Sequence, residues 1–267
     1  MMEFDFSVVY ETDEEDFDGL DMYYGSRSLQ GISEAISIAS HGIVNKSYIN
    51  RSTARKGIKI DFKTSYVGSF KQRFKVVFNS ERSVANIHDL TAKSYIELLR
   101  YTLGQVVGEN IEINRRTAIK NFEKMYFSED ITHRLTTSIF DAHLPVKYQG
   151  YKATLYAAQT PVVVFNKNSL SYLEEEIESP TSENLVVGIS RFNARTGTGR
   201  LVEDYDGDSF SFVPAHAFSK KQKGILARSL HGLTQGNFVR LDAEVTRVTL
   251  NNGATKYFIL HKADLIP

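Results

Sequence analysis

Hydrophobic and polar residues alternate in several short stretches of the first half of the chain, a pattern typical of β-strands. The alternation begins at residues 3–10. It returns at residues 57–66 and 70–78, which are separated by a link that contains Gly68. Because glycine tolerates the backbone angles of a tight turn, this pair of stretches predicts a hairpin. Two shorter strands are predicted at residues 151–157 and 162–166.

Other stretches carry apolar residues at three- and four-residue spacing, as on the buried side of an amphipathic helix. Residues 26–44 and 88–107 have this spacing, and two further helices are predicted to begin at the capping residues Asn114 and Asp130. The strands and helices together predict an α+β domain over residues 1–172, with a small sheet packed by helices.

The last third of the chain has a different pattern, with short strands separated by turns rich in Gly, Asn and Asp. An acidic segment at residues 173–184 is the predicted linker to this part. Five strands within residues 185–267 predict an all-β barrel, because closure removes the exposed edges of a small sheet. The predicted strands cover residues 186–192, 199–204, 208–213, 237–248 and 255–262, and a long insertion occupies residues 214–235.

The charge of the chain is unevenly distributed, although the net charge of its 267 residues is zero. Residues 1–24 carry −9 and residues 173–184 carry −5, whereas residues 25–172 carry +10 and residues 185–267 carry +4. With no cysteine, the chain has no disulfide or thiolate metal site. The acidic start and the absence of a long apolar run predict a cytoplasmic protein without a membrane partner.

Several short motifs of the last third occur in a recognisable order. They are Gly188 in the first strand, Phe192-Asn193-Ala194, Thr196-Gly197-x-Gly199, Asp208-x-Phe210-x-Phe212 and the segment Leu233–Val239. In this order they resemble a cold-shock domain, a barrel of the oligonucleotide-binding (OB) type. The resemblance implies a single-stranded nucleic acid as partner, with bases stacked on aromatic rings of the second and third strands.

The resemblance assigns roles to particular residues. Phe192, Phe210 and Phe212 match positions at which the family stacks bases, although Phe212 replaces a histidine. Thr198 and Arg200 replace two further aromatic residues, and a guanidinium takes over part of their role because it stacks and also binds phosphate. The neighbouring basic residues expected to contact phosphates are Arg191, Arg195, Lys220 and Lys221.

An alternative stays open for the same positions. Phe210 and Phe212 are two residues apart on a strand, so they share a face that can be the barrel interior. Barrels of this shape also serve as docking modules for proteins.

The N-terminal part has a resemblance of its own, carried by Ser28-Leu29-x-Gly31-Ile32 and by Gly68-Ser69-Phe70. These motifs are similar to an uncharacterised bacterial domain family that often precedes a small β-barrel. Members of that family occur among mobile and phage-defence genes, and the resemblance implies no activity.

The predicted hairpin has one apolar face and one basic face. Like charges on neighbouring strands are destabilising unless something neutralises them. Two candidates for this role are a polyanion and the acidic residues 13–16 of the chain itself. An ordinary solvent-exposed face is the alternative. The residues of this secondary basic face are Lys59, Lys63, Lys71, Arg73 and Lys75.

Catalytic chemistry has little support in the sequence. No histidine has the spacing of a metal site, and Asp61-Phe62-Lys63 has the D-x-K spacing of metal-dependent nucleases without an obvious partner acid. We therefore expect no catalytic residue, metal or cofactor. The predicted function is non-catalytic nucleic-acid binding or regulation. The alternatives are a protein-interaction scaffold in a bacterial defence or mobile-element complex and, third, a metal-dependent nuclease.

Overall fold

A computed structural model describes residues 1–12, 19–46, 57–66, 70–124, 129–205 and 207–266. The chain divides into two compact units, Met1–Glu174 and Glu175–Pro267. The first is an α+β unit and the second contains a closed five-stranded barrel, so the predicted fold class is confirmed.

The first unit is built on a five-stranded antiparallel sheet in the order β2-β3-β1-β4-β5. The central strand of this sheet is thus the first strand of the chain. The predicted hairpin forms β2 and β3, although its link at residues 67–69 lies outside the described residues. The strands are β1 (Met2–Glu11), β2 (Ile58–Tyr66), β3 (Phe70–Phe78), β4 (Lys152–Ala157) and β5 (Thr160–Phe165).

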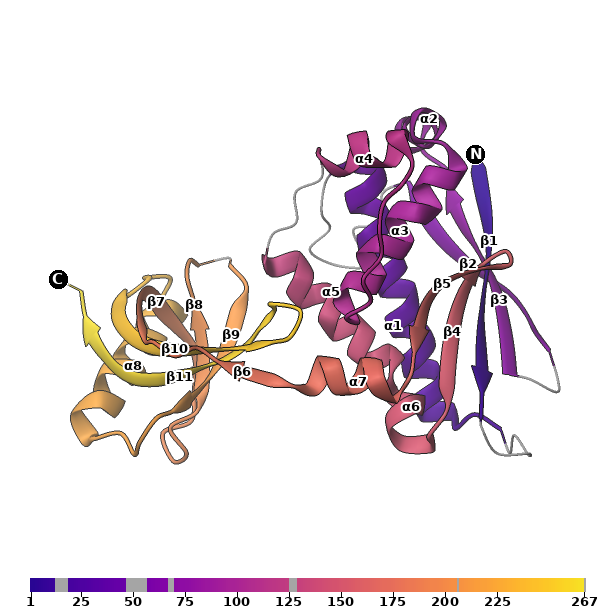
Figure 1. The fold of residues 1–267 in the computed structure, drawn as a ribbon. Coiled ribbons are helices and arrows are strands. Elements are labelled where there is room, and N and C mark those ends of the chain that lie inside the picture. The colour runs from indigo at the N-terminus through magenta and orange to yellow at the C-terminus, as the bar shows by residue number, and fades with distance from the viewer. Residues whose placement is uncertain (13–18, 47–56, 67–69, 125–128, 206, 267) are drawn as a thin grey trace. The chain divides into compact units, whose positions relative to one another are not determined.

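Helices α1 and α3 lie on one face of this sheet, and α5 packs against α1 (Figure 1). The predicted helix over residues 88–107 is in fact two helices, because Thr91 has a φ of 70° and caps the second one through its side chain. The helices are α1 (Met22–Ser40), which continues as a π-helix (His41–Asn45), α2 (Glu81–Leu90), α3 (Ala92–Val106), α4 (Arg116–Phe122), α5 (Glu129–Ala142), α6 (Leu144–Gln149) and α7 (Lys167–Glu174).

The core of the first unit lies between the sheet and these helices. Phe6 of β1 is opposite Phe74 of β3, and their rings stack with centroids 5.7 Å apart. Gly31 of α1 has no room for a side chain, because a Cβ there would collide with the backbone of α5 at Ser138. Ser28, one turn earlier, donates a hydrogen bond to the Ala142 carbonyl at 2.8 Å. The motif that contains Ser28 and Gly31 therefore sets the close approach of α1 and α5.

A buried histidine follows α5. His143 Nδ1 lies 2.7 Å from the Ile139 carbonyl oxygen, and its Nε2 lies 2.8 Å from Ser169 Oγ. Burial lowers the pKa of His143 to about 4, because the charged imidazolium is poorly solvated there. Ser169 Oγ also accepts from the Asn166 amide at 2.8 Å and so belongs to the cap of α7. This Ser–His contact is therefore a structural link between α5 and α7.

We expect the first unit to lose stability as the pH falls from about 6.5 towards 4. Unfolded His143 binds a proton in this range while the folded residue does not, so acid favours unfolding. The shift corresponds to a loss on the order of 2 kcal/mol between pH 7 and pH 4.5. Urea unfolding at both pH values measures it. His143→Gln should lack this part of the pH dependence, whereas His88→Gln, at an exposed position, should keep it. Equal pH dependence in His143→Gln and the wild type would contradict the assignment.

The second unit is a barrel closed by five strands in the order β7-β8-β9-β11-β10, with β10 returning to β7. β9 and β11 are parallel, and the other neighbours are antiparallel. With a helix between the third and fourth barrel strands, this arrangement is consistent with an OB-like barrel. The elements are β6 (Glu176–Glu178), β7 (Glu183–Phe192), β8 (Gly199–Val202), β9 (Ser209–Pro214), α8 (Lys220–Thr234), β10 (Leu241–Leu250) and β11 (Thr255–Leu265).

Two segments have secondary structure that the sequence pattern did not predict. Within the predicted acidic linker 173–184, residues Glu176–Glu178 form β6 and pair with β10. The insertion 214–235 is largely helical, because Leu226 and its apolar neighbours cover the barrel core while Ser219 caps the first turn. None of the described helices is long and apolar enough to cross a membrane.

Candidate nucleic-acid interface

The outer and inner faces of β8 and β9 follow the two-residue alternation of a strand. Leu201 lies opposite Phe210, and Gly199 lies opposite Phe212. These four positions face the barrel interior, where Leu201 and Phe212 belong to the core. The outer face is left to the intervening residues, among them Arg200 and its cross-strand partner Ser211.

Phe212, which was predicted to contact nucleic acid, lies inside the barrel. Its side chain is only 1% exposed and is among the largest fully buried side chains of the protein. A Cβ on Gly199 would collide with the Phe212 ring, so glycine at that position makes room for the ring inside the barrel. A buried ring offers no face to a base.

Phe192 and Phe210 are half-buried and pack against the same core. The Phe210 ring meets the Phe258 ring edge to face, with centroids 5.9 Å apart. Because both rings remain partly exposed, their contact with a base stays a prediction. Neither ring, however, stands on the outer face of the strands, where Arg200 and Ser211 lie.

Two arginines lie beside each other on this outer face. Arg200 donates hydrogen bonds from Nε to Ser209 Oγ at 2.7 Å and from Nη1 to Ser211 Oγ at 3.4 Å. Arg191 of β7 lies directly opposite Arg200 in the ladder. Two like charges at such a position repel each other, so an anion bound between them would stabilise the pair.

The loop between β7 and β8 holds a third arginine in solvent. Asn193 Oδ1 accepts hydrogen bonds from the backbone amides of Arg195 at 3.0 Å and Thr196 at 3.3 Å. Gly197, with a φ of +82°, closes the turn and lies against Phe218. Since Phe218 directly precedes the cap of α8, the loop lies near the first turn of that helix.

Lys220 and Lys221 occupy that first turn and are exposed. The turn contains no acidic residue, so two positive charges lie at the end of the helix where the backbone dipole favours a negative charge. An anion near this turn would interact favourably with both lysines and with the dipole.

The basic residues of the barrel differ in whether they are paired. In the described part of the chain, Arg191, Arg195, Arg200, Lys220 and Lys221 form no ion pair with a carboxylate, and the same holds for Lys223, Arg228 and Arg240 elsewhere in the barrel. Three others are paired, with nitrogen–oxygen distances of 2.5–2.8 Å. These pairs are Arg247–Glu183, Lys256–Glu176 and Lys262–Asp264.

The secondary basic face of the hairpin is partly neutralised by its own sheet. Lys75 Nζ lies 2.6 Å from the Glu3 carboxylate, and Lys59 Nζ lies 2.7 Å from Asp61. The hydrogen bond from Lys75 lowers the pKa of Glu3. Arg73 stands opposite Ser7, further along the same face. The acidic residues 13–16, the other predicted neutralising group, lie outside the described residues.

Lys63 and Lys71 complete the predicted set. Lys63 lies at a bulge in β2 and is exposed, while Lys71 of β3 lies opposite Val9. Acids therefore interrupt the basic face at Lys59 and Lys75, and the five residues do not form one continuous positive stripe.

The structure also bears on the nuclease alternative. Asp61 is engaged by Lys59, as above, and the described residues contain no group of three or more His, Cys, Asp or Glu side chains that could hold a metal ion. The geometry therefore gives no support to metal-dependent chemistry at Asp61.

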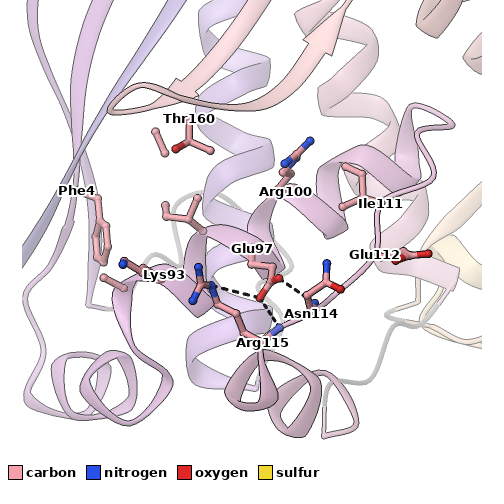
Figure 2. Close-up of a pocket in the computed structure, with 12 residues that line it drawn as sticks. Phe4, Lys93, Glu97, Arg100, Ile111, Glu112, Asn114, Arg115 and Thr160 are labelled. Atoms are coloured by element: carbon pink, nitrogen blue, oxygen red, sulfur yellow. Dashed lines mark hydrogen bonds and ion pairs between the residues drawn. The ribbon is translucent and has the colours of Figure 1, made fainter.

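Sequence reasoning missed a groove in the first unit, lined on one side by Lys93 and Arg100 of α3 (Figure 2). These residues are seven positions apart and so lie on the same side of a helix. That spacing was a usable signal, but β1 and the β4–β5 hairpin, which complete the groove together with the segment 111–115, are distant from α3 in sequence.

Among comparisons with known proteins, a match is found for the first unit. No curated protein and no solved structure matches the chain. A family model matches residues 6–174, and its end coincides with the end of the first unit at Glu174. The prediction of an uncharacterised N-terminal domain is thereby confirmed. Because the match covers more than half of the chain, the protein belongs to this family, which is described as a domain of unknown function (DUF7946).

Proposed function

We propose that the protein binds single-stranded nucleic acid without catalysing a reaction, mainly through phosphate contacts on the outer side of β7 and β8 and the start of α8. The observation that carries this proposal is the group of five basic residues without carboxylate partners at this surface. The phosphates of a nucleic acid neutralise such a group, and binding of the basic residues to the phosphates releases the counterions of the nucleic acid.

The composition of this surface predicts binding without stacking of bases on aromatic rings. Proteins that bind single strands by stacking present aromatic rings to the bases. Here the outer face of β8 and β9 carries Arg200, Ser209 and Ser211 together with the aliphatic Val202 and Val213, and no aromatic ring. Arginine and hydroxyl groups bind phosphate oxygens whatever the base, so the contact is expected to tolerate any sequence.

Binding of a mixed-sequence, single-stranded oligonucleotide to the full chain tests the proposal. Each phosphate contact to a single strand contributes about −0.7 to the slope of log affinity against log salt, so five contacts give a slope of about −3.5. We expect the affinity to fall about 100-fold between 50 and 200 mM salt. Fluorescence anisotropy of a labelled oligonucleotide measures both quantities.

Two results would count against the proposal. One is the absence of binding at low salt. The other is binding with little salt dependence and a strong preference for one base, which would indicate stacking instead of phosphate contact. A stable protein that co-purifies with the chain, without any oligonucleotide binding, would favour the scaffold alternative.

A further inference from the structure

The groove of the first unit encloses about 450 Å³, within the usual range for sites of small ligands. Helix α3 lines it with Lys93, Ile96, Glu97 and Arg100. Figure 2 shows Phe4 of β1 and Thr160 of β5 on one side of this helix, and the segment that leads into α4 on the other. The groove is thus formed by three separate parts of the first unit.

Glu97 holds the segment that forms one wall. Its carboxylate accepts hydrogen bonds from the backbone amides of Asn114 at 2.9 Å and Arg115 at 3.2 Å. Arg115 Nε lies 3.9 Å from the same carboxylate. Because these groups surround its charge, Glu97 fixes the wall and is not available to neutralise the other basic residues of the groove.

Lys93 and Arg100 are those basic residues. Both are exposed, and neither forms an ion pair or hydrogen bond among the residues with described structure. They are seven positions apart in the helix, which corresponds to about 10 Å along its axis. Glu112, the second acid of the lining, points away from Arg100 in Figure 2. The groove therefore has two free positive charges, near its two ends.

The surface between these charges suits a planar organic group. Phe4 is held against Phe78 and Tyr95, with ring centroids 5.8 and 4.9 Å away, so its ring forms a fixed apolar wall beside Ile96. The side-chain amide of Asn114 has no partner in the described structure and offers both a donor and an acceptor.

We propose that this groove binds a nucleoside monophosphate or a nucleotide of similar size. The phosphate binds Lys93 or Arg100, the base lies against Phe4 and Ile96, and Asn114 hydrogen-bonds the edge of the base. A phosphate needs the basic residues and a base needs the apolar wall with an amide beside it, and the groove brings these features together. This site lies in the first unit and does not depend on the function proposed for the barrel.

Calorimetric titration of the full chain tests the site, with adenosine and cytidine 5′-monophosphates as probes and adenosine and inorganic phosphate as comparisons. We expect at least one nucleotide to bind about tenfold or more tightly than either comparison compound. The double variant Lys93→Gln, Arg100→Gln should weaken nucleotide binding about tenfold or more. The double variant Lys120→Gln, Lys167→Gln, at exposed lysines of α4 and α7 outside the groove lining, removes the same number of charges; it is the matched control and should bind as the wild type does.

The proposal is overturned if neither nucleotide binds, if inorganic phosphate binds as tightly as the nucleotides, or if the double variant binds them unchanged. Thermal unfolding of the double variant checks that the fold is kept, which is expected because both side chains are exposed. A variant of the barrel arginines should still bind the nucleotides, so the two proposals can fail separately.

Discussion

Replacing Arg191, Arg195 and Arg200 together by alanine is expected to weaken oligonucleotide binding about 100-fold or more at low salt. A hydrogen bond to a charged group contributes about 1.5 kcal/mol or more, and three such contacts to phosphates are lost. The slope of log affinity against log salt should become less steep by about 2, because each lost phosphate contact removes about 0.7. Fluorescence anisotropy across several salt concentrations measures both effects.

A matched control separates this effect from a general loss of charge. The triple variant of Arg240, Lys256 and Lys262 to alanine removes the same number of positive charges from other parts of the barrel, two of them paired with carboxylates. It should bind the oligonucleotide within about threefold of the wild type, since two of these charges are already compensated and none of the three residues belongs to β7, β8 or the first turn of α8. Equal losses in both variants would show that net charge, and not the β7–β8 surface, attracts the nucleic acid.

Most of the fold could be predicted from the sequence, because the periodic patterns are strong and the turns carry glycine. The hairpin of β2 and β3 and the strands of the barrel lie close to the expected positions. The break between α2 and α3 was missed, because Thr91 adopts a left-handed φ of 70° that is unusual for a threonine. Residues 176–178 were missed as a strand, because their three residues gain stability only through the pairing with β10.

The candidate site was harder to predict than the fold. Motif order correctly placed Arg191 and Arg200 on neighbouring strands, but it could not say which side of the barrel each aromatic residue faces. The decisive information is the register between β8 and β9, which puts Phe212 opposite Gly199 inside the barrel. Pairing across the sheet likewise explains why the basic face of the hairpin is partly neutralised, since the acid beside Lys75 is Glu3 of β1.

The interior and the outer face of the barrel differ in how well their residues match the cold-shock pattern. Residues that match the cold-shock pattern, such as Gly199 and Phe210, face the barrel interior. Arg200, which departs from the pattern, lies on the outer face. A sequence match carried by interior residues therefore supports the fold and says little about the ligand, which is why the outer arginines carry the functional proposal.

Phe212→Ala is expected to destabilise the barrel by about 3–5 kcal/mol, the usual cost of removing a fully buried phenylalanine ring. Phe210→Ala should cost less, about 1–2 kcal/mol, because that ring is only half-buried. Hydrogen–deuterium exchange in peptides of β7 to β11 follows the barrel separately from the first unit. Exchange in these strands should become about 100-fold faster or more in Phe212→Ala and much less so in Phe210→Ala.

Ser211→Ala, next to Phe212 on the opposite face, is the matched control and should leave exchange close to that of the wild type. The pair of phenylalanine variants also decides between an interior and a surface role for the aromatic motif. If Phe212→Ala loses oligonucleotide binding while exchange stays slow, the ring contacts the ligand and its place in the core is wrong. If binding is lost only where exchange is fast, the ring supports the surface from inside, and the phosphate contacts belong to the arginines outside.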